Sequence, residues 1–126
     1  KFMLEVNLKN AIEKQEFYIL YQPQVRLKDN KIVGLEALPR WNNSEFGIVP
    51  PNKFIPIAEK CGFIEPITNW VINEVCQQME KWDSNGYEPI RVAINLSRKE
   101  IGKNDMVQRV SHIVTKYDIE YHRIEF

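Results

Sequence analysis

The sequence predicts an α/β fold whose later strands run parallel. Two segments rich in β-forming residues, Phe17–Val25 and Ile32–Leu38, flank the turn-forming pair Asp29-Asn30, which predicts an antiparallel hairpin. Beyond the hairpin, helical and strand-like patterns alternate along the chain. Because strands joined through helical crossovers run parallel, this alternation predicts α/β architecture.

The first half of the chain is expected to open with a helix and to continue into the hairpin. Apolar residues recur at helical spacing over Leu4–Ile12, which predicts an amphipathic lead-in helix within residues 1–15. Phe17–Tyr21 is apolar on both alternating faces, as expected of a buried strand. After the hairpin, Asn, Ser, Gly and Pro residues cluster over Pro39–Asn52 and predict a loop.

The second half is expected to alternate helices and strands. A first helix is predicted from Pro51 to Gly62, because proline suits the first helical position and glycine the stop, and Pro56 is expected to kink it. A longer helix is predicted over Pro66–Trp82, where apolar residues form one stripe. The remaining elements are a strand, a helix and a strand, expected at Ile90–Leu96, Val107–Tyr117 and Ile119–Phe126.

The charge balance and the apolar runs exclude several kinds of partner. The chain has 126 residues with 17 Lys and Arg against 17 Asp and Glu, so it lacks the positive charge with which proteins bind DNA or RNA polymers and anionic membranes. The longest uninterrupted apolar run is Phe17–Tyr21, far shorter than the roughly 20 residues of a membrane-spanning helix, so we expect no membrane contact by this segment. The cysteines and histidines have no metal-ligand spacing and are interpreted as structural: Cys61, Cys76, His112 and His122.

The second predicted strand carries two charges on one face. Because side chains alternate along a strand, Glu36, Leu38 and Arg40 point to the same side. Four residues of strand span about 13 Å, so Glu36 and Arg40 need separate partners. A metal ion would suit the carboxylate, and a phosphate would suit the guanidinium fork. The alternative is that both side chains simply face solvent from an edge strand.

Two amides lie close to predicted strand ends. Asn95 is near the carboxyl end of its strand, where α/β folds build their sites, and its amide oxygen would ligate a hard cation beside a carboxylate. The alternative is that Asn95 only leads the chain into Ser97–Glu100, which has the form of a helix capping box. Gln22-Pro23 interrupts the first strand and is typical of a strand end or a sheet edge.

Five blocks of sequence, in this order and spacing, resemble the EAL domain family. The resemblance covers nearly the whole chain and implies a modified, TIM-like β/α barrel whose first strand runs antiparallel, of which residues 1–126 would form the N-terminal half. The blocks are Tyr21-Gln22-Pro23, Gly34–Trp41, Phe54–Glu59, Ile67 with Trp70-Val71, and Val92–Ser97.

The resemblance also implies a function. EAL domains are bacterial, cytoplasmic phosphodiesterases that hydrolyse the second messenger cyclic di-GMP to the linear dinucleotide pGpG. By this resemblance, Glu36 and Asn95 are catalytic ligands of Mg²⁺ or Mn²⁺, and Arg40 holds a phosphate of the substrate. Gln22 and Leu38 would help to line the dinucleotide site. Lead-in helices of this family commonly follow an upstream GGDEF or sensory domain, through which the parent protein would reach a membrane.

Two features bear on whether this chain is active. Family members continue from a segment like Ile124–Phe126 into further acidic strands, so we expect the 126-residue chain alone to be inactive and to self-associate as a dimer. Pro39 stands where the family usually has an aliphatic residue, and we expect it to end strand pairing early and to shift Arg40. A shifted Arg40 would favour the alternative, a degenerate EAL domain that acts as a cyclic di-GMP receptor or a protein-interaction module.

Overall fold

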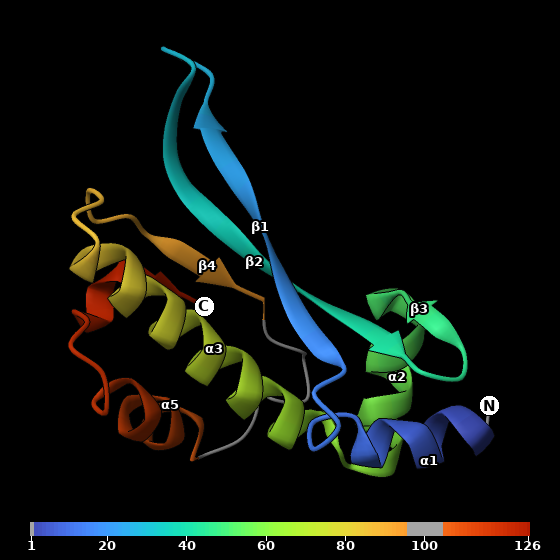
Figure 1. Cartoon of the computed structure of the whole chain (residues 1–126). Coiled ribbons are helices and arrows are strands. Elements are labelled where there is room, and N and C mark those ends of the chain that lie inside the picture. Colours follow the sequence, from blue (N-terminus) through green and yellow to red (C-terminus); the bar gives the residue numbers. More distant parts are fainter. Residues whose placement is uncertain (1, 96–104) are drawn as a thin grey trace.

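The computed structural model describes residues 2–95 and 105–126. Within these ranges, five strands form one sheet in the order β1-β2-β4-β5, with β3 pairing with the far end of β2. β1 (Phe17–Arg26) and β2 (Lys31–Asn43) are antiparallel, β4 (Val92–Ile94) runs parallel to β2, and β5 (Ile124–Glu125) runs parallel to β4 (Figure 1). The predicted hairpin and the predicted parallel strands are therefore confirmed.

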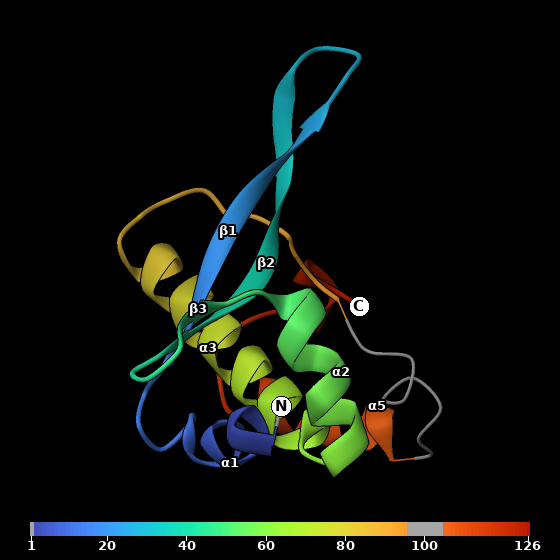
Figure 2. The same ribbon diagram turned by 90° about the vertical axis from the view of Figure 1, so that its right-hand side faces the viewer.

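The helices leave the end of the hairpin free. α3 (Ile64–Ser84) runs along the sheet with α5 (Met106–Val114) packed against it, while α1 (Phe2–Asn10) and α2 (Pro51–Cys61) pack together near the end of β2 that carries β3. Figures 1 and 2 show the tip of the β1–β2 hairpin projecting beyond these helices. None of the helices in the described ranges is long and apolar enough to cross a membrane.

The core lies between the helices and one face of the sheet. Phe17 at the start of β1 packs against Trp41 of β2, Phe54 of α2 and Trp70 of α3, with ring centroids 5.9, 5.5 and 5.7 Å apart. Successive side chains of a strand point to opposite faces, so the residues that alternate with this set lie on the other face of the hairpin. There, Tyr18 and Leu20 are 39% and 48% exposed.

The predicted loop over Pro39–Asn52 is wrong. β2 continues through Pro39 to Asn43, and the three residues of β3 (Gly47–Val49) pair back with its end. Pro39 pairs with Ile19 of β1, while neither β3 nor β4 pairs with β2 at this position. A proline is tolerated where the strand needs no donor, so Pro39 does not end the pairing as the sequence predicted.

The predicted ends of the first helix after the hairpin are confirmed: α2 begins with Pro51 and is capped after Cys61 by Gly62, whose φ of 75° is the left-handed conformation that favours glycine. The helix continues through Pro56. Other boundaries differ from the prediction. β4 is shorter than the predicted strand, and a 3₁₀ turn at Tyr121–Arg123 occupies much of the last predicted strand. The predicted capping box at Ser97–Glu100 lies outside the described residues.

Candidate functional site

Glu36 and Asn95 meet on the face of the sheet opposite the helices α2 and α3, which we call the open face. The parallel register pairs Glu36 of β2 with Ala93 of β4, and Asn95 follows two residues later on the same side. The side-chain amide of Asn95 donates a hydrogen bond of 2.6 Å from Nδ2 to Oε2 of Glu36. β2 has β1 on one side and β4 on the other, so the alternative that Glu36 belongs to an edge strand is wrong.

The antiparallel register of the hairpin brings β1 residues to the same face. Gln22 pairs with Glu36, and Leu20 pairs with Leu38. Directly opposite residues of an antiparallel pair share a face and have Cβ atoms about 5 Å apart. Gln22 and Leu38 therefore lie on the same face as the pair of Glu36 and Asn95. Gln22 and Asn95 are exposed, and Glu36 and Leu38 are half-buried.

Arg40 lies further along β2 on this face. It is half-buried, and Nη1 of its guanidinium donates a hydrogen bond of 3.0 Å to the backbone carbonyl of Pro39. The next residue, Trp41, is completely buried on the opposite face, so the backbone beside Arg40 is fixed in the core. All five residues predicted to form the site thus lie on one face of the sheet, and among the described residues Glu36 and Asn95 are the two of them that hydrogen-bond to each other.

Three further residues on this face were missed by the sequence analysis. Tyr18 pairs with Arg40, and Leu20 pairs with Leu38. Glu125 of β5 pairs with Ala93, which in turn pairs with Glu36, so the two carboxylates are separated by one strand that carries a small side chain between them. The signal for Tyr18 and Leu20 was their alternation with Gln22 along the first strand.

The site has the oxygen donors that a hard cation prefers, but few of them. A carboxylate and a side-chain amide suit Mg²⁺ or Mn²⁺, provided that Asn95 turns its oxygen rather than its nitrogen toward the ion. Within residues 2–95 and 105–126, no group of three or more His, Cys, Asp or Glu residues is arranged to hold a metal. A cation at Glu36 and Asn95 would therefore need ligands beyond these two residues.

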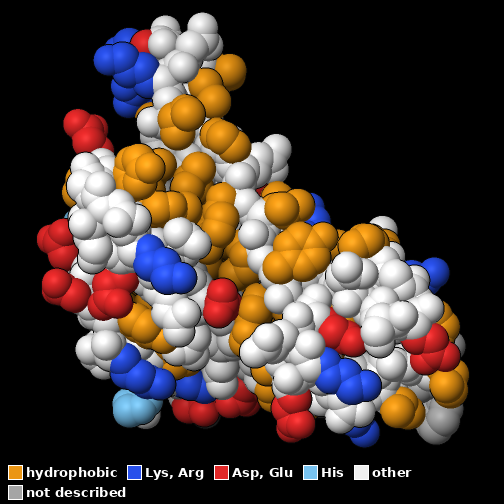
Figure 3. Space-filling view, viewed as in Figure 1, with side chains coloured by type: hydrophobic (Ala, Val, Ile, Leu, Met, Phe, Trp, Pro, Cys, Tyr) orange, Lys and Arg blue, Asp and Glu red, His pale blue; other side chains and the backbone are white. Residues whose placement is uncertain are grey.

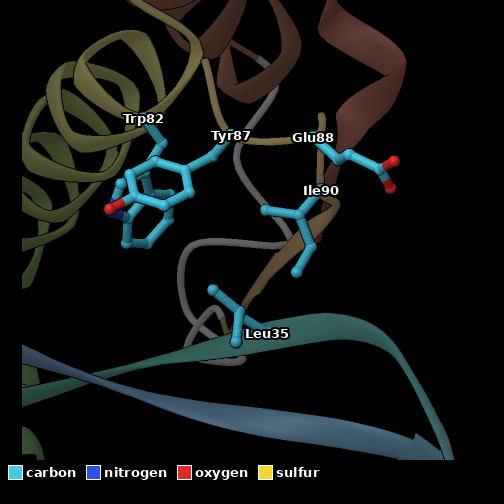
Figure 4. Close-up of a pocket in the computed structure, with 5 residues that line it drawn as sticks. All are labelled: Leu35, Trp82, Tyr87, Glu88 and Ile90. Atoms are coloured by element: carbon cyan, nitrogen blue, oxygen red, sulfur yellow. The ribbon is translucent and has the colours of Figure 1, made fainter. Parts of the chain in front are cut away.

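A separate hollow lies on the other side of the sheet. It has a volume of about 350 Å³ and is lined by Leu35, Trp82, Tyr87, Glu88 and Ile90 (Figure 4). Leu35 precedes Glu36 on β2, so its side chain leaves the strand on the opposite face. In Figure 4 the carboxylate of Glu88 points away from the aromatic side chains of Trp82 and Tyr87. This hollow is therefore not part of the candidate site.

Comparison with known proteins assigns the family. The model of the EAL domain family matches residues 5–126. The chain belongs to the EAL domain family. It is 36% identical over 124 residues to the oxygen sensor protein DosP of Escherichia coli K12, covering 98% of this chain and 16% of that protein. It is also 32% identical over 125 residues to the cyclic di-GMP phosphodiesterase PA2567 of Pseudomonas aeruginosa, covering 98% of this chain and 21% of that protein.

Solved EAL domains share the fold. The PaMucR phosphodiesterase in complex with c-di-GMP superposes with a TM-score of 0.90 at 32% identity, covering 97% of this chain and 49% of that chain. The FimX EAL domain from Pseudomonas aeruginosa bound to c-di-GMP has a TM-score of 0.82 at 21% identity, a likeness that supports the fold alone. The predicted partial, TIM-like β/α barrel with an antiparallel first strand is thus confirmed, and the chain spans about half of these solved EAL chains.

Proposed function

We propose that the protein containing this chain hydrolyses cyclic di-GMP to pGpG. The observation that carries the proposal is the convergence of Glu36 and Asn95, 2.6 Å apart, on the face that also carries Gln22, Leu38 and Arg40. Relatives named cyclic di-GMP phosphodiesterases, and a solved relative in complex with c-di-GMP, support the choice of substrate.

Each residue has a role that follows from its chemistry. Arg40 would bind a phosphate of the dinucleotide through two charge-assisted hydrogen bonds, giving up its present bond to the Pro39 carbonyl. Gln22 and Leu38 would help to line the dinucleotide site. Glu36 and Asn95 would hold Mg²⁺ or Mn²⁺, which when bound neutralises phosphate charge and makes water more acidic.

Pro39 no longer favours the receptor alternative. That alternative rested on the expectation that Pro39 ends strand pairing and displaces Arg40. Because the register of β1 and β2 continues through Pro39, with Tyr18 opposite Arg40, this reason for a non-catalytic domain is lost. We therefore infer hydrolysis rather than binding alone.

The test is the substitution Glu36→Gln in the complete protein. We expect this substitution to lower the turnover of cyclic di-GMP with Mg²⁺ or Mn²⁺ by about 100-fold or more. Turnover is measured by chromatography of the nucleotides. Glu88→Gln is the control, because Glu88 is an exposed carboxylate beside the separate hollow on the other side of the sheet. Unchanged turnover of Glu36→Gln at saturating metal would refute the assignment. Tight binding without turnover by the unmodified protein would establish the receptor alternative.

We also propose that the 126-residue chain alone is inactive and self-associates. A cation held by Glu36 and Asn95 alone would complete most of its shell with water, and such a cation activates a nucleophile poorly. The projecting hairpin exposes apolar side chains (Figure 3). Among them, Leu27 is 92% exposed. Exposed apolar patches favour association with another chain. If light scattering shows a monomer, the proposed self-association is wrong. If the 126-residue chain hydrolyses cyclic di-GMP measurably, the proposed inactivity is wrong.

The proposed substrate implies the surroundings of the protein. Cyclic di-GMP signalling would place the domain in the bacterial cytoplasm, with α1 following a GGDEF or sensory domain in the parent protein. The sequence of the parent gene upstream of Lys1 tests this arrangement directly.

A further inference from the structure

Glu16 is the centre of a hydrogen-bond network at the end of β2. Its Oε1 accepts hydrogen bonds from the indole Nε1 of Trp41 at 2.9 Å and from Nδ2 of Asn43 at 3.1 Å. Its Oε2 accepts from the backbone N–H of Ser44 at 3.4 Å. Its own backbone carbonyl accepts from the N–H of Asn42 at 3.0 Å. One residue before β1 thus contacts four consecutive residues of the β2 end, Trp41–Ser44.

Asn43 extends this network to the N-terminal helix. Asn43 is 2% exposed, and its Nδ2 also donates to Oδ1 of Asn7 in α1 at 3.3 Å. Its Oδ1 accepts from the backbone N–H groups of Glu45 and Phe46 at 3.0 and 2.8 Å. Asn7 in turn donates to Oε1 of Glu45 at 3.4 Å. A displacement of α1 would therefore pull on the end of β2 through Asn7.

The carboxylate of Glu16 is suited to this role because it is charged. Burial raises the pKa of Glu16, but the hydrogen bonds from Trp41, Asn43 and Ser44 together outweigh this effect and hold the pKa below its ordinary value. Glu16 is therefore ionised at neutral pH. Hydrogen bonds to an ionised acceptor are roughly twice as strong as those between neutral groups.

Trp41 connects the network to the open face of the sheet. It directly follows Arg40, and consecutive residues of a strand point to opposite faces. The fully buried indole of Trp41 is held by packing against Phe17 and Phe54 and by its bond to Glu16. The orientation of this side chain sets the backbone from which Arg40 projects.

We propose that Glu16 is a positioning residue that orients Arg40 through Trp41. Through Asn7, the orientation of Arg40 then depends on where α1 lies. The inference rests on the proposed function for the ligand of Arg40, but it adds a connection between the N-terminal helix and the phosphate-binding side chain. A movement imposed on α1 would then change the affinity for cyclic di-GMP through the position of Arg40.

α1 offers a matched control. Asn7 and Asn10 each donate from Nδ2 to a carbonyl four residues earlier, Met3 and Val6 respectively. Among the described residues, Asn10 makes no side-chain hydrogen bond outside the helix, whereas Asn7 also reaches Asn43 and Glu45. Asn7→Ala and Asn10→Ala therefore remove the same bond within the helix, and only Asn7→Ala cuts the network.

The experiment measures cyclic di-GMP affinity by calorimetry in the complete protein. We expect Asn7→Ala and Glu16→Gln to weaken binding by about 3- to 10-fold and Asn10→Ala by less than about 2-fold. In the background of Arg40→Ala, Asn7→Ala should have no further effect, because positioning acts through Arg40. An equal loss for both asparagine variants, or an effect of Asn7→Ala that persists without Arg40, would overturn the inference.

A second measurement needs no ligand. In the ligand-free complete protein, the ¹⁵N relaxation of the Arg40 Nε–H group reports how firmly the side chain is held. We expect greater mobility in Asn7→Ala and Glu16→Gln than in Asn10→Ala or the unmodified protein. If the unmodified protein does not bind cyclic di-GMP, the proposed function fails, while the Arg40 relaxation still decides the positioning role. Unchanged Arg40 mobility in all variants would refute it.

Discussion

Replacing Asp83 with Asn tests how one buried ion pair holds the later strands in place. The carboxylate of Asp83, in the last turn of α3, accepts two hydrogen bonds from the guanidinium of Arg123, at 2.7 and 3.1 Å. The same guanidinium donates to the backbone carbonyl of Ile90. Arg123 is 6% exposed and directly precedes β5, while Ile90 lies just before β4. The pair therefore fastens the end of one helix to the starts of two strands.

The expected loss follows from burial. Removing one partner of a fully buried ion pair costs about 3 to 5 kcal/mol, because the remaining charge is left uncompensated. The side chain of Asp83 is 29% exposed, and Asn keeps one oxygen that accepts a hydrogen bond, so we expect Asp83→Asn to lower the free energy of unfolding by about 2 kcal/mol.

The hairpin provides a control, an ion pair of the same two residue types that is exposed to solvent. Arg26 and Asp29 form an equally close pair, with hydrogen bonds of 3.0 and 2.6 Å, but their side chains are 52% and 34% exposed. Exposed ion pairs contribute little to stability, so Asp29→Asn should lower the free energy of unfolding far less than Asp83→Asn does. Urea unfolding followed by tryptophan fluorescence at neutral pH measures both variants. Equal losses for the two variants would refute the argument that burial sets the energy.

Three further predictions concern pH, thiol chemistry and close packing. Hydrogen bonding to its guanidinium partner holds the pKa of Asp83 below the ordinary value of 3.8, so the ion pair stabilises the fold above about pH 4 and this contribution is lost as pH falls through the folded pKa. The stability difference between the unmodified chain and Asp83→Asn, measured by urea unfolding, should therefore shrink as the pH falls below about 4. Burial raises the pKa of Cys76 to about 11, so a disulfide reagent at about pH 8 should modify the half-buried Cys61 in the native chain and Cys76 only after unfolding. A Cβ atom at Gly34 would lie 3.2 Å from the Arg91 carbonyl oxygen, so Gly34→Ala should lower the free energy of unfolding in urea by about 1 kcal/mol.

The hairpin and the faces of its strands could be predicted because the signals are local. Asp29-Asn30 predicted the turn, and in the structure Asn30 has a φ of 57° and donates from its N–H to the carbonyl of Arg26. Alternation along β2 then placed Glu36 and Arg40 on one face. Only neighbouring residues enter such arguments, so they do not depend on knowing the rest of the fold.

The features that failed depend on partners distant in sequence. Pro39 and the residues after it have the composition of a loop, but their pairing with β1 and β3 makes them a strand. The bond between Glu16 and Trp41 joins residues 25 positions apart, and the ion pair of Asp83 and Arg123 joins residues 40 apart. No local pattern marks such pairs. The lengths of β4 and β5 are likewise set by where a parallel neighbour is available for pairing. Alternation of side chains alone therefore predicts strands that are too long.

The two faces of the sheet make the candidate site depend on the core. Ala37 and Trp41 of β2 are fully buried on the helix side, while Glu36 and Arg40 leave the same strand on the open side. A slip of one residue in the pairing of β2 would exchange these two sets, and burial of Trp41 prevents it. The contact between Glu36 and Asn95 thus depends on the packing of other residues, on the opposite face of the sheet. Substitutions that weaken packing between the helices and the sheet should therefore displace Glu36 and Arg40 while the chain is still folded.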